Sequence, residues 1–251
     1  MADDALYHDP ALAQFYDFDN HWGVDDQFCL SLARQAGSVL DLGCGTGRLA
    51  TAIALQTGAQ VTGVDPAGAM LAIAAAKPGG DKVRWIRADA CDLALEARFD
   101  LVVLTGHAFQ VFLDQSARSA LLASIARHLT PQGRFIFDSR NPAAREWQDW
   151  TPEATRMRRD HPTLGPVDSW NDIEWDDSTA IATYQTHYRI VRTDETCTAR
   201  SCIAFPTQSA LAHDIALAGL VVGQWLGDWS GTPYTPAAPE IIPLGRLAPA
   251  P

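Results

Sequence analysis

The sequence predicts an α/β protein built on a doubly wound, mostly parallel sheet. Two observations carry this prediction. Short segments of β-type residues alternate five times with helix-type segments before residue 141, and this alternation is typical of a parallel sheet with helices on both faces. The segment 99–104 is nearly all apolar, as in a strand that is buried on both faces.

Each predicted element has its own signal. Apolar residues recur at helical spacing between 22 and 36 and stop at Gly37. An alanine-rich helix at 66–76 begins with Pro66, and a helix at 114–129 is capped by Asp114. The predicted strands of this half are 38–42, 60–64, 83–87, 99–104 and 134–137, and a further helix covers about 47–56.

The second half of the chain begins with a change of composition. Residues 143–205 are rich in Trp, Tyr, Thr and charged residues, and they include a predicted hairpin of 179–191 and 196–205. A helix at 207–218 and two strands, 220–226 and 241–246, then resume the first pattern. We therefore expect a single domain over residues 1–251 that contains an antiparallel β insertion at 143–205.

The composition excludes several classes of protein. The 251 residues carry a net charge of −11, which disfavours nucleic acid as a partner. Five scattered cysteines without a Cys-x-x-Cys pair argue against a disulfide framework and a zinc site, so we expect no metal. The N-terminus lacks the apolar core of a signal peptide, and no stretch approaches the roughly 20 apolar residues of a membrane span. These features predict a soluble, cytoplasmic protein.

The segment after the first strand has an unusual spacing of glycines. Asp41 ends the strand, and Gly43, Gly45 and Gly47 follow at alternate positions. Such a turn between a strand and a helix makes a binding edge, because glycine lets a ligand approach the backbone. A dinucleotide-binding turn has a small residue at its sixth position, where this chain has Arg48. The acid before the turn suits a ligand that carries an ammonium group.

These residues resemble the motif of the class I S-adenosylmethionine-dependent methyltransferases, which reads acid-x-Gly-x-Gly-x-Gly. The resemblance continues at later strand ends. It implies that Asp65 binds the ribose hydroxyls and that Asp89 and Ala90 meet the adenine. It places Thr105 and His107 in a loop beside the transferred methyl group. Because each residue follows a successive strand, we expect them to meet in one crevice at the carboxyl edge of the sheet.

The same resemblance implies the rest of the architecture. S-adenosylmethionine would be the cofactor, held at the turn by Asp41, Gly43 and Gly45, and the N-terminal segment with Tyr16 would fold over it. The sheet would have seven strands with an antiparallel last strand, and the insertion would cap the substrate side. His107 would either accept a proton from the methyl acceptor, since its reference pKa is near neutral, or only hydrogen-bond its own loop.

The expected function is transfer of a methyl group to a nitrogen, oxygen or carbon nucleophile of a small molecule. An NAD-dependent oxidoreductase is one alternative, against which Asp41 and Arg48 count. A non-catalytic module that binds S-adenosylmethionine is another. A nucleic-acid methyltransferase that modifies amino groups would often carry an Asn/Asp-Pro-Pro-aromatic run after the fourth strand, where this chain has Thr-Gly-His-Ala at 105–108. The sequence leaves the identity of the acceptor and the oligomeric state open.

Overall fold

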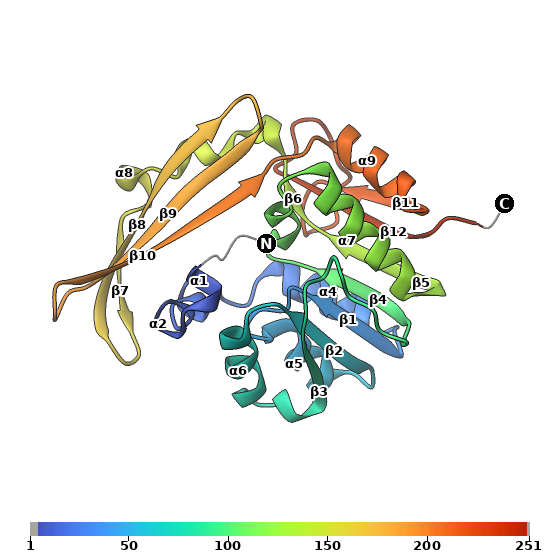
Figure 1. Ribbon diagram of the computed structural model, residues 1–251, viewed down its shortest axis with the longest axis horizontal. Helices are drawn as coiled ribbons and strands as arrows, with labels where there is room; N and C mark the ends of the chain where they lie inside the picture. The colour runs from blue at the N-terminus through green and yellow to red at the C-terminus, as the bar shows by residue number, and fades with distance from the viewer. Residues whose placement is uncertain (1–4, 250–251) are drawn as a thin grey trace.

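The computed structural model describes residues 5–249. Its core is one sheet of strand order β11-β12-β5-β4-β1-β2-β3, with a short strand, β6, paired to β12 (Figure 1). The strands of this sheet are β1 (Ser38–Leu42), β2 (Gln60–Asp65), β3 (Val83–Arg87), β4 (Phe99–Leu104), β5 (Leu129–Phe137), β6 (Ser139–Arg140), β11 (Leu220–Leu226) and β12 (Glu240–Leu247).

The strand directions follow the predicted pattern. β1 pairs in parallel with β2 and β4, β2 with β3, and β4 with β5. β12 lies between β11 and β5 and is antiparallel to both. The prediction of a mostly parallel, seven-stranded sheet with an antiparallel last strand is confirmed, and β6 is an additional two-residue strand.

Helices cover both faces of the core sheet. They are α4 (Val24–Ala33), α5 (Arg48–Gln56), α6 (Gly68–Ala76), α7 (Gln115–His128) and α9 (Gln208–Leu217). Alternate residues of β4 divide between the two faces, because side chains of a strand point alternately up and down. Val102 and Leu104 belong to the apolar cluster under α7 and α9, whereas Leu101 and Val103 belong to the cluster under α4 and α5. Within the described residues, no helix is both long and apolar enough to cross a membrane.

A second sheet of four antiparallel strands, in the order β10-β9-β8-β7, projects from the core, and we call it the cap (Figure 1). Its strands are β7 (Met157–His161), β8 (Gly165–Asp176), β9 (Ile181–Ile190) and β10 (Glu195–Ala204), and the short helices η3 (Pro142–Ala144), η4 (Glu146–Asp149) and α8 (Pro152–Thr155) lead to them.

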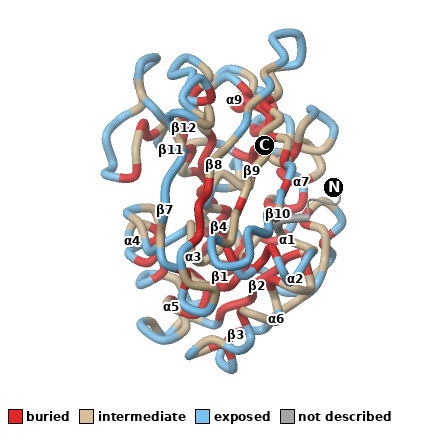
Figure 2. Tube along the Cα trace, turned by 90° about the vertical axis from the view of Figure 1, so that its left-hand side faces the viewer, coloured by how far each residue is buried: buried red, intermediate tan, exposed pale blue. Residues whose placement is uncertain are grey.

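The sequence predicted the hairpin of β9 and β10 but not β7 or β8. β8 pairs with β9 from Val167 to Asp176, yet its polar residues fall on both faces. One face is solvent and the other includes Ser169 and Asn171, which line a cavity. The period-two alternation of apolar residues is therefore weak. Figure 2 shows β7 as largely exposed and β8 as buried over part of its length.

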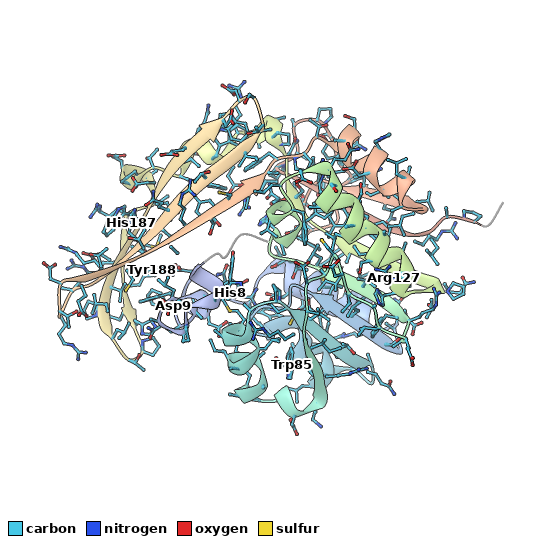
Figure 3. All side chains as sticks on the ribbon, viewed as in Figure 1. His8, Asp9, Trp85, Arg127, His187 and Tyr188 are labelled. Atoms are coloured by element: carbon cyan, nitrogen blue, oxygen red, sulfur yellow. The ribbon has the colours of Figure 1, made fainter. Side chains whose placement is uncertain are left out.

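The N-terminal segment lies against the cap. Its helices are α1 (Ala5–His8), α2 (Pro10–Ala13) and α3 (Tyr16–Asp19). Phe15 is fully buried and stacks on the ring of Tyr188 in β9 with 4.2 Å between ring centroids. Figure 3 shows Tyr188 near His8, the last residue of α1, and Asp9, which caps α2. The Tyr188 hydroxyl donates a hydrogen bond to Asp19, so this segment is joined to the cap by both apolar and polar contacts.

β5 begins at Leu129 and not at Arg134, where the sequence predicts its start. Pro131 and Gly133, residue types that usually end a helix, lie inside β5. The β4–β5 register shifts between Phe99 and Leu101, and a Cβ at position 133 would lie 2.7 Å from the Phe99 carbonyl oxygen. Gly133 is therefore required by this close approach of the two strands.

Candidate functional site

The glycine turn lies at the carboxyl end of β1 and leads into α5. Gly43, Gly45 and Gly47 have φ values of +63°, +52° and +72°, in the left-handed region that side chains disfavour. A Cβ at position 45 would face the ring of Tyr16 at 3.5 Å, whereas a Cβ at position 47 would lie 2.5 Å from the ring of Trp85. Gly45 thus keeps the backbone open beneath Tyr16, and Gly47 lets Trp85 pack.

Asp65 connects the end of β2 to this turn. Its Oδ2 accepts a hydrogen bond from the Gly45 N–H at 2.9 Å, and its Oδ1 accepts one from the Ala67 N–H at 2.8 Å. The residue is buried at 7% exposure and lines the cavity described below. Burial raises its pKa, and the two backbone N–H groups oppose that rise. Each carboxylate oxygen still has a lone pair for a ligand.

Asp41 lies deeper than the sequence analysis anticipated. It is 3% exposed, and burial raises its pKa to about 8, with the charges of Asp26 and Asp65 adding to the rise. Arg48 pairs with Asp26 at 3.0 Å. Among the described residues, those that line the cavity do not include Asp41. Asp41 is placed under the turn, not in the cavity wall.

Asp89 and Ala90, the two residues expected to meet the adenine, have different positions in the structure. Ala90 lines the cavity, whereas Asp89 is not among the described residues that do. The Asp89 Oδ1 accepts a hydrogen bond from the Cys91 N–H at 2.9 Å, which closes a short turn. In the structure this carboxylate is thus already engaged in holding the loop after β3.

Tyr16 lies over the glycine turn, as the resemblance implied for the N-terminal segment. Burial raises the pKa of its hydroxyl above the usual value. Its neighbour Asp17 accepts a hydrogen bond from Thr46 at 2.6 Å and pairs with Lys77 at 2.7 Å. These contacts fix α3 to the turn and to the end of α6, and the ring of Tyr16 thereby covers Gly45.

His107 occupies the loop between β4 and the short helix η2 (Ala108–Val111). Its φ of +59° is in the left-handed region, which costs a residue with a side chain about 1 kcal/mol or more. The backbone N–H donates to Asp138 Oδ1 at 3.0 Å, and Nε2 lies 2.8 Å from Glu240 Oε1. Burial lowers the pKa of His107, but the Asp138 charge and the Glu240 hydrogen bond outweigh burial, so the pKa is raised.

Glu240 is a residue of this site that the sequence analysis missed. It is the first residue of β12, 133 positions after His107 in the chain. No motif marks it, because only the insertion of β12 between β5 and β11 brings it to the loop after β4. A polar residue that begins the last strand, close to the end of the chain, would have been the only signal.

Several of the residues above line one cavity of about 1070 Å³ between the core, the cap and the N-terminal segment. Its volume lies just above the range of about 300–1,000 Å³ that is usual for small-molecule sites, which is large enough for a cofactor together with a second small molecule. The predicted site residues in its wall are Tyr16, Gly43, Gly45, Asp65, Ala90, Thr105 and His107, and the cap contributes Ser169, Asn171, Tyr184 and Thr186.

Three arginines in the cavity wall, Arg48, Arg140 and Arg159, are engaged by neighbouring residues. Arg48 also donates to the Asn20 carbonyl at 2.6 Å. Arg140 donates to Gln110 at 3.0 Å and pairs with Glu146 at 3.3 Å. Arg159 pairs with Asp19. Arg140 therefore has a carboxylate of the protein, Glu146, as its partner. Residues 5–249 contain no group of three His, Cys, Asp or Glu side chains able to hold a metal ion.

Comparisons with known proteins agree with this geometry. Residues 39–133 match a family model described as a methyltransferase domain. A curated relative, the cypemycin N-terminal methyltransferase of a Streptomyces species, is 38% identical over 106 residues, which are 42% of this chain and 43% of the relative. The matched region thus spans less than two thirds of the relative's length.

Solved structures resemble the chain over nearly its whole length. An S-adenosylmethionine-dependent methyltransferase from Clostridium acetobutylicum has a TM-score of 0.79 at 17% identity, covering 95% of this chain and 98% of its own. The sugar N-methyltransferase KedS8 from a Streptoalloteichus species has a TM-score of 0.71 at 17% identity, covering 94% and 91%.

The fold and the site together define the class I methyltransferase architecture. Residues 39–133, which include the glycine turn, Asp65 and Asp89, match the methyltransferase domain, and the solved structures share the fold of the chain. The comparisons give no support to an NAD-dependent oxidoreductase. The sequence prediction of the fold class is therefore confirmed, and the match over residues 39–133 supports the predicted resemblance to methyltransferases.

Proposed function

We propose that the protein transfers a methyl group from S-adenosylmethionine to a nitrogen, oxygen or carbon nucleophile of a small molecule. The observation that carries this proposal is the position of Asp65. Its carboxylate is fixed by the Gly45 and Ala67 N–H groups at the cavity wall, where it can accept hydrogen bonds from both hydroxyls of a ribose.

The other cofactor contacts follow from the same geometry. Gly43 and Gly45 form a cradle that side chains would fill, and Ala90 and Thr105 flank it. Asp41, beneath the turn, supplies negative charge for the ammonium group of the cofactor, and Asp89 orders the loop that meets the adenine. Tyr16 covers the turn from the N-terminal side. These residues fit a nucleoside that carries a positively charged amino acid tail.

The bound cofactor would supply an activated methyl group on a sulfonium, which needs no metal for its transfer. The contribution of the chain is to position the acceptor in line and to exclude water. The cap provides the opposite wall of the cavity with polar side chains, including Asn171 and Thr186. His107, in the same wall, accepts the acceptor's proton where the nucleophile carries one.

A cavity with room for two ligands favours an enzyme over a module that only binds the cofactor. A sheet of four strands closes the cavity opposite the glycine turn, which a cofactor sensor does not require. We further propose that residues 143–205 form a substrate cap within one domain of residues 1–251. A cytoplasmic location fits the unpaired cysteines of the described chain, and fractionation of the native host tests it.

The first experiment is calorimetric titration of the purified protein with S-adenosylmethionine, S-adenosylhomocysteine and NAD. We expect both sulfur nucleosides to bind and NAD not to bind. The Asp65→Ala variant should weaken binding of both nucleosides by about 1–3 kcal/mol, because the ribose hydroxyls lose their acceptor.

Asp81→Ala is the matched control, since Asp81 is exposed and lies outside the cavity wall. Binding of NAD alone would contradict the proposed function. Equal binding by Asp65→Ala and the wild type would contradict the role of Asp65.

A further inference from the structure

Glu240 has a carboxylate oxygen without a protein partner. Its Oε1 is taken up by His107 Nε2, but its Oε2 is buried and forms no hydrogen bond with any residue in the described part of the chain. Glu240 also lines the cavity. A buried carboxylate oxygen without a donor is unfavourable, so this oxygen indicates a donor that arrives with a ligand.

The neighbouring cation does not fill this role. Arg140 is directly opposite Glu240 in the pairing of β6 with β12. Its guanidinium donates instead to Gln110 and Glu146, and it lies 5.1 Å from the ring centroid of Trp150. Arg140 thus donates to these partners, and Glu240 Oε2 receives no hydrogen bond from its guanidinium.

Two acidic side chains lie close to the single imidazole of His107. Asp138 Oδ2 lies 3.6 Å and Glu240 Oε1 lies 2.8 Å from its Nε2, so two carboxylates share one imidazole. Such a site favours a second positive charge. An ammonium group offers three donors and a full charge, whereas a neutral hydroxyl offers one donor and no charge.

We propose that the methyl acceptor is an amine that enters the cavity as an ammonium ion, and that Glu240 Oε2 binds its N–H groups. This inference rests on the proposed function and specifies its substrate class. It places the acceptor nitrogen beside His107 and in the same cavity as Gly43 and Gly45 of the cofactor turn.

Methyl transfer requires the neutral amine, because the nitrogen lone pair forms the bond to the methyl carbon while the carbon–sulfur bond breaks and its electron pair stays on sulfur. One ammonium N–H bond therefore breaks first. Its electron pair stays on nitrogen, and the proton passes to the imidazole of His107 and then to water. His107 must be neutral when it accepts this proton.

The groups that face His107 explain how it becomes neutral. Asp138 and Glu240 raise its pKa, and Arg140 lowers it. A bound ammonium adds a positive charge beside Glu240. This charge partly offsets the stabilisation that the Glu240 carboxylate gives to protonated His107. The pKa of His107 therefore falls when an amine binds, and the ring releases its own proton before it receives the one from the amine.

The test is a pH titration of the His107 ring by NMR in the full-length protein saturated with S-adenosylhomocysteine. The probe is methylammonium chloride, with methanol and potassium chloride as matched additives, and His107→Gln identifies the signal. We expect methylammonium to lower the pKa of His107 by about one unit and methanol to leave it unchanged. An unmoved His107 titration with methylammonium would overturn the inference.

Glu240→Gln separates the carboxylate charge from the shape of the side chain. The amide oxygen still accepts from His107 Nε2, and we expect the methylammonium shift to disappear in this variant. Glu146→Gln, which removes the exposed carboxylate that pairs with Arg140, should keep the shift. An equal shift in Glu240→Gln would assign the ammonium to another group. Failure of S-adenosylhomocysteine to bind in calorimetry would instead refute the proposed function.

Discussion

Gly45 and Gly47 belong to one motif, but a side chain would meet different surroundings at each. A Cβ at position 47 would overlap the ring of Trp85 and lie 2.8 Å from the Cβ of Ala74. A Cβ at position 45 would reach Tyr16 at ordinary contact distance. The two substitutions to alanine should therefore be distinguishable by stability and by binding.

We expect Gly47→Ala to lower the free energy of unfolding by about 2–4 kcal/mol, since it combines a left-handed φ with a steric overlap in the core. Gly45→Ala should cost about 1–2 kcal/mol from backbone strain alone, and it should weaken binding of S-adenosylhomocysteine more than Gly47→Ala does. Urea unfolding and calorimetry measure both effects. Equal losses of stability in the two variants would contradict the distinction.

The raised pKa of Asp41 should make the free energy of unfolding depend on pH. Burial raises its folded-state pKa to about 8, while an unfolded chain has a value near ~4. The folded protein therefore holds a proton that the unfolded chain releases, and this contribution to stability is lost as the pH rises from about 4 to about 8.

Asp41→Asn cannot lose that proton, so its stability relative to the wild type should rise between pH 5 and pH 8 by up to a few kcal/mol. Urea unfolding of both proteins at the two pH values measures the difference. Above about pH 8, where Asp41 of the wild type is ionised, affinity for the cofactor should fall in the same variant, because the negative charge is gone. A stability difference that is the same at both pH values would show that Asp41 is ionised throughout.

At the site, the sequence predicted residues that follow strands in chain order. Asp65, Thr105 and His107 line the cavity because parallel strands end at one edge. Glu240 could not be found in this way, since it begins an antiparallel strand and enters the same edge from the opposite direction. The depth of Asp41 could not be predicted either, because it depends on how α4 and α5 pack around β1.

Among the elements, α3 is bound to both the core and the cap by side-chain contacts. Two of its acids, two positions apart, are held by different parts of the molecule. Asp17 pairs with Lys77 and Thr46 of the core, and Asp19 receives Arg159 and Tyr188 of the cap. Tyr16 precedes both and covers the glycine turn. α3 therefore connects the cofactor region to the cap.

Asp17→Asn should leave stability almost unchanged, because the Asp17–Lys77 pair is partly exposed and such pairs contribute less than about 1 kcal/mol. It should raise the dissociation rate of S-adenosylhomocysteine about fivefold, since Tyr16 is held less firmly over the turn. Stopped-flow fluorescence measures the rate, and Asp81→Asn is the exposed control. An unchanged dissociation rate would show that Tyr16 does not retain the nucleoside.

The elements of the core were predictable and those of the cap were only partly so. Buried strands such as β4 are apolar along nearly their whole length, so they can be recognised from the sequence alone. β7 and β8 do not, because β7 lies at the exposed edge of the cap and one face of β8 borders a polar cavity. The early start of β5 was hidden by Pro131 and Gly133, which are tolerated where the register shifts.

In the molecule as a whole, the cavity is built by three parts that are distant in sequence. The carboxyl edge of the core sheet gives the glycine turn, Asp65 and His107, the N-terminal segment gives Tyr16, and the cap gives polar side chains such as Asn171. No part encloses the space alone. Local patterns in the sequence predict parts of this kind. The contacts between the parts, such as Phe15 on Tyr188, join residues far apart in the chain, and no sequence motif links such residues.

Trp85 imposes a constraint that extends over two strands and the turn. A Cβ at position 63 in β2 would lie 2.4 Å from its ring, as a Cβ at position 47 would at 2.5 Å, and its indole N–H donates to the Gly80 carbonyl at 2.8 Å. Gly63 has no positive φ, so a side chain there is excluded by the size of residue 85 and, to a smaller extent, by Cys44 Sγ at 3.1 Å. Over evolutionary time, positions 63 and 85 should therefore covary as a pair of complementary volumes, while Gly47 stays fixed by its backbone whatever residue replaces the tryptophan.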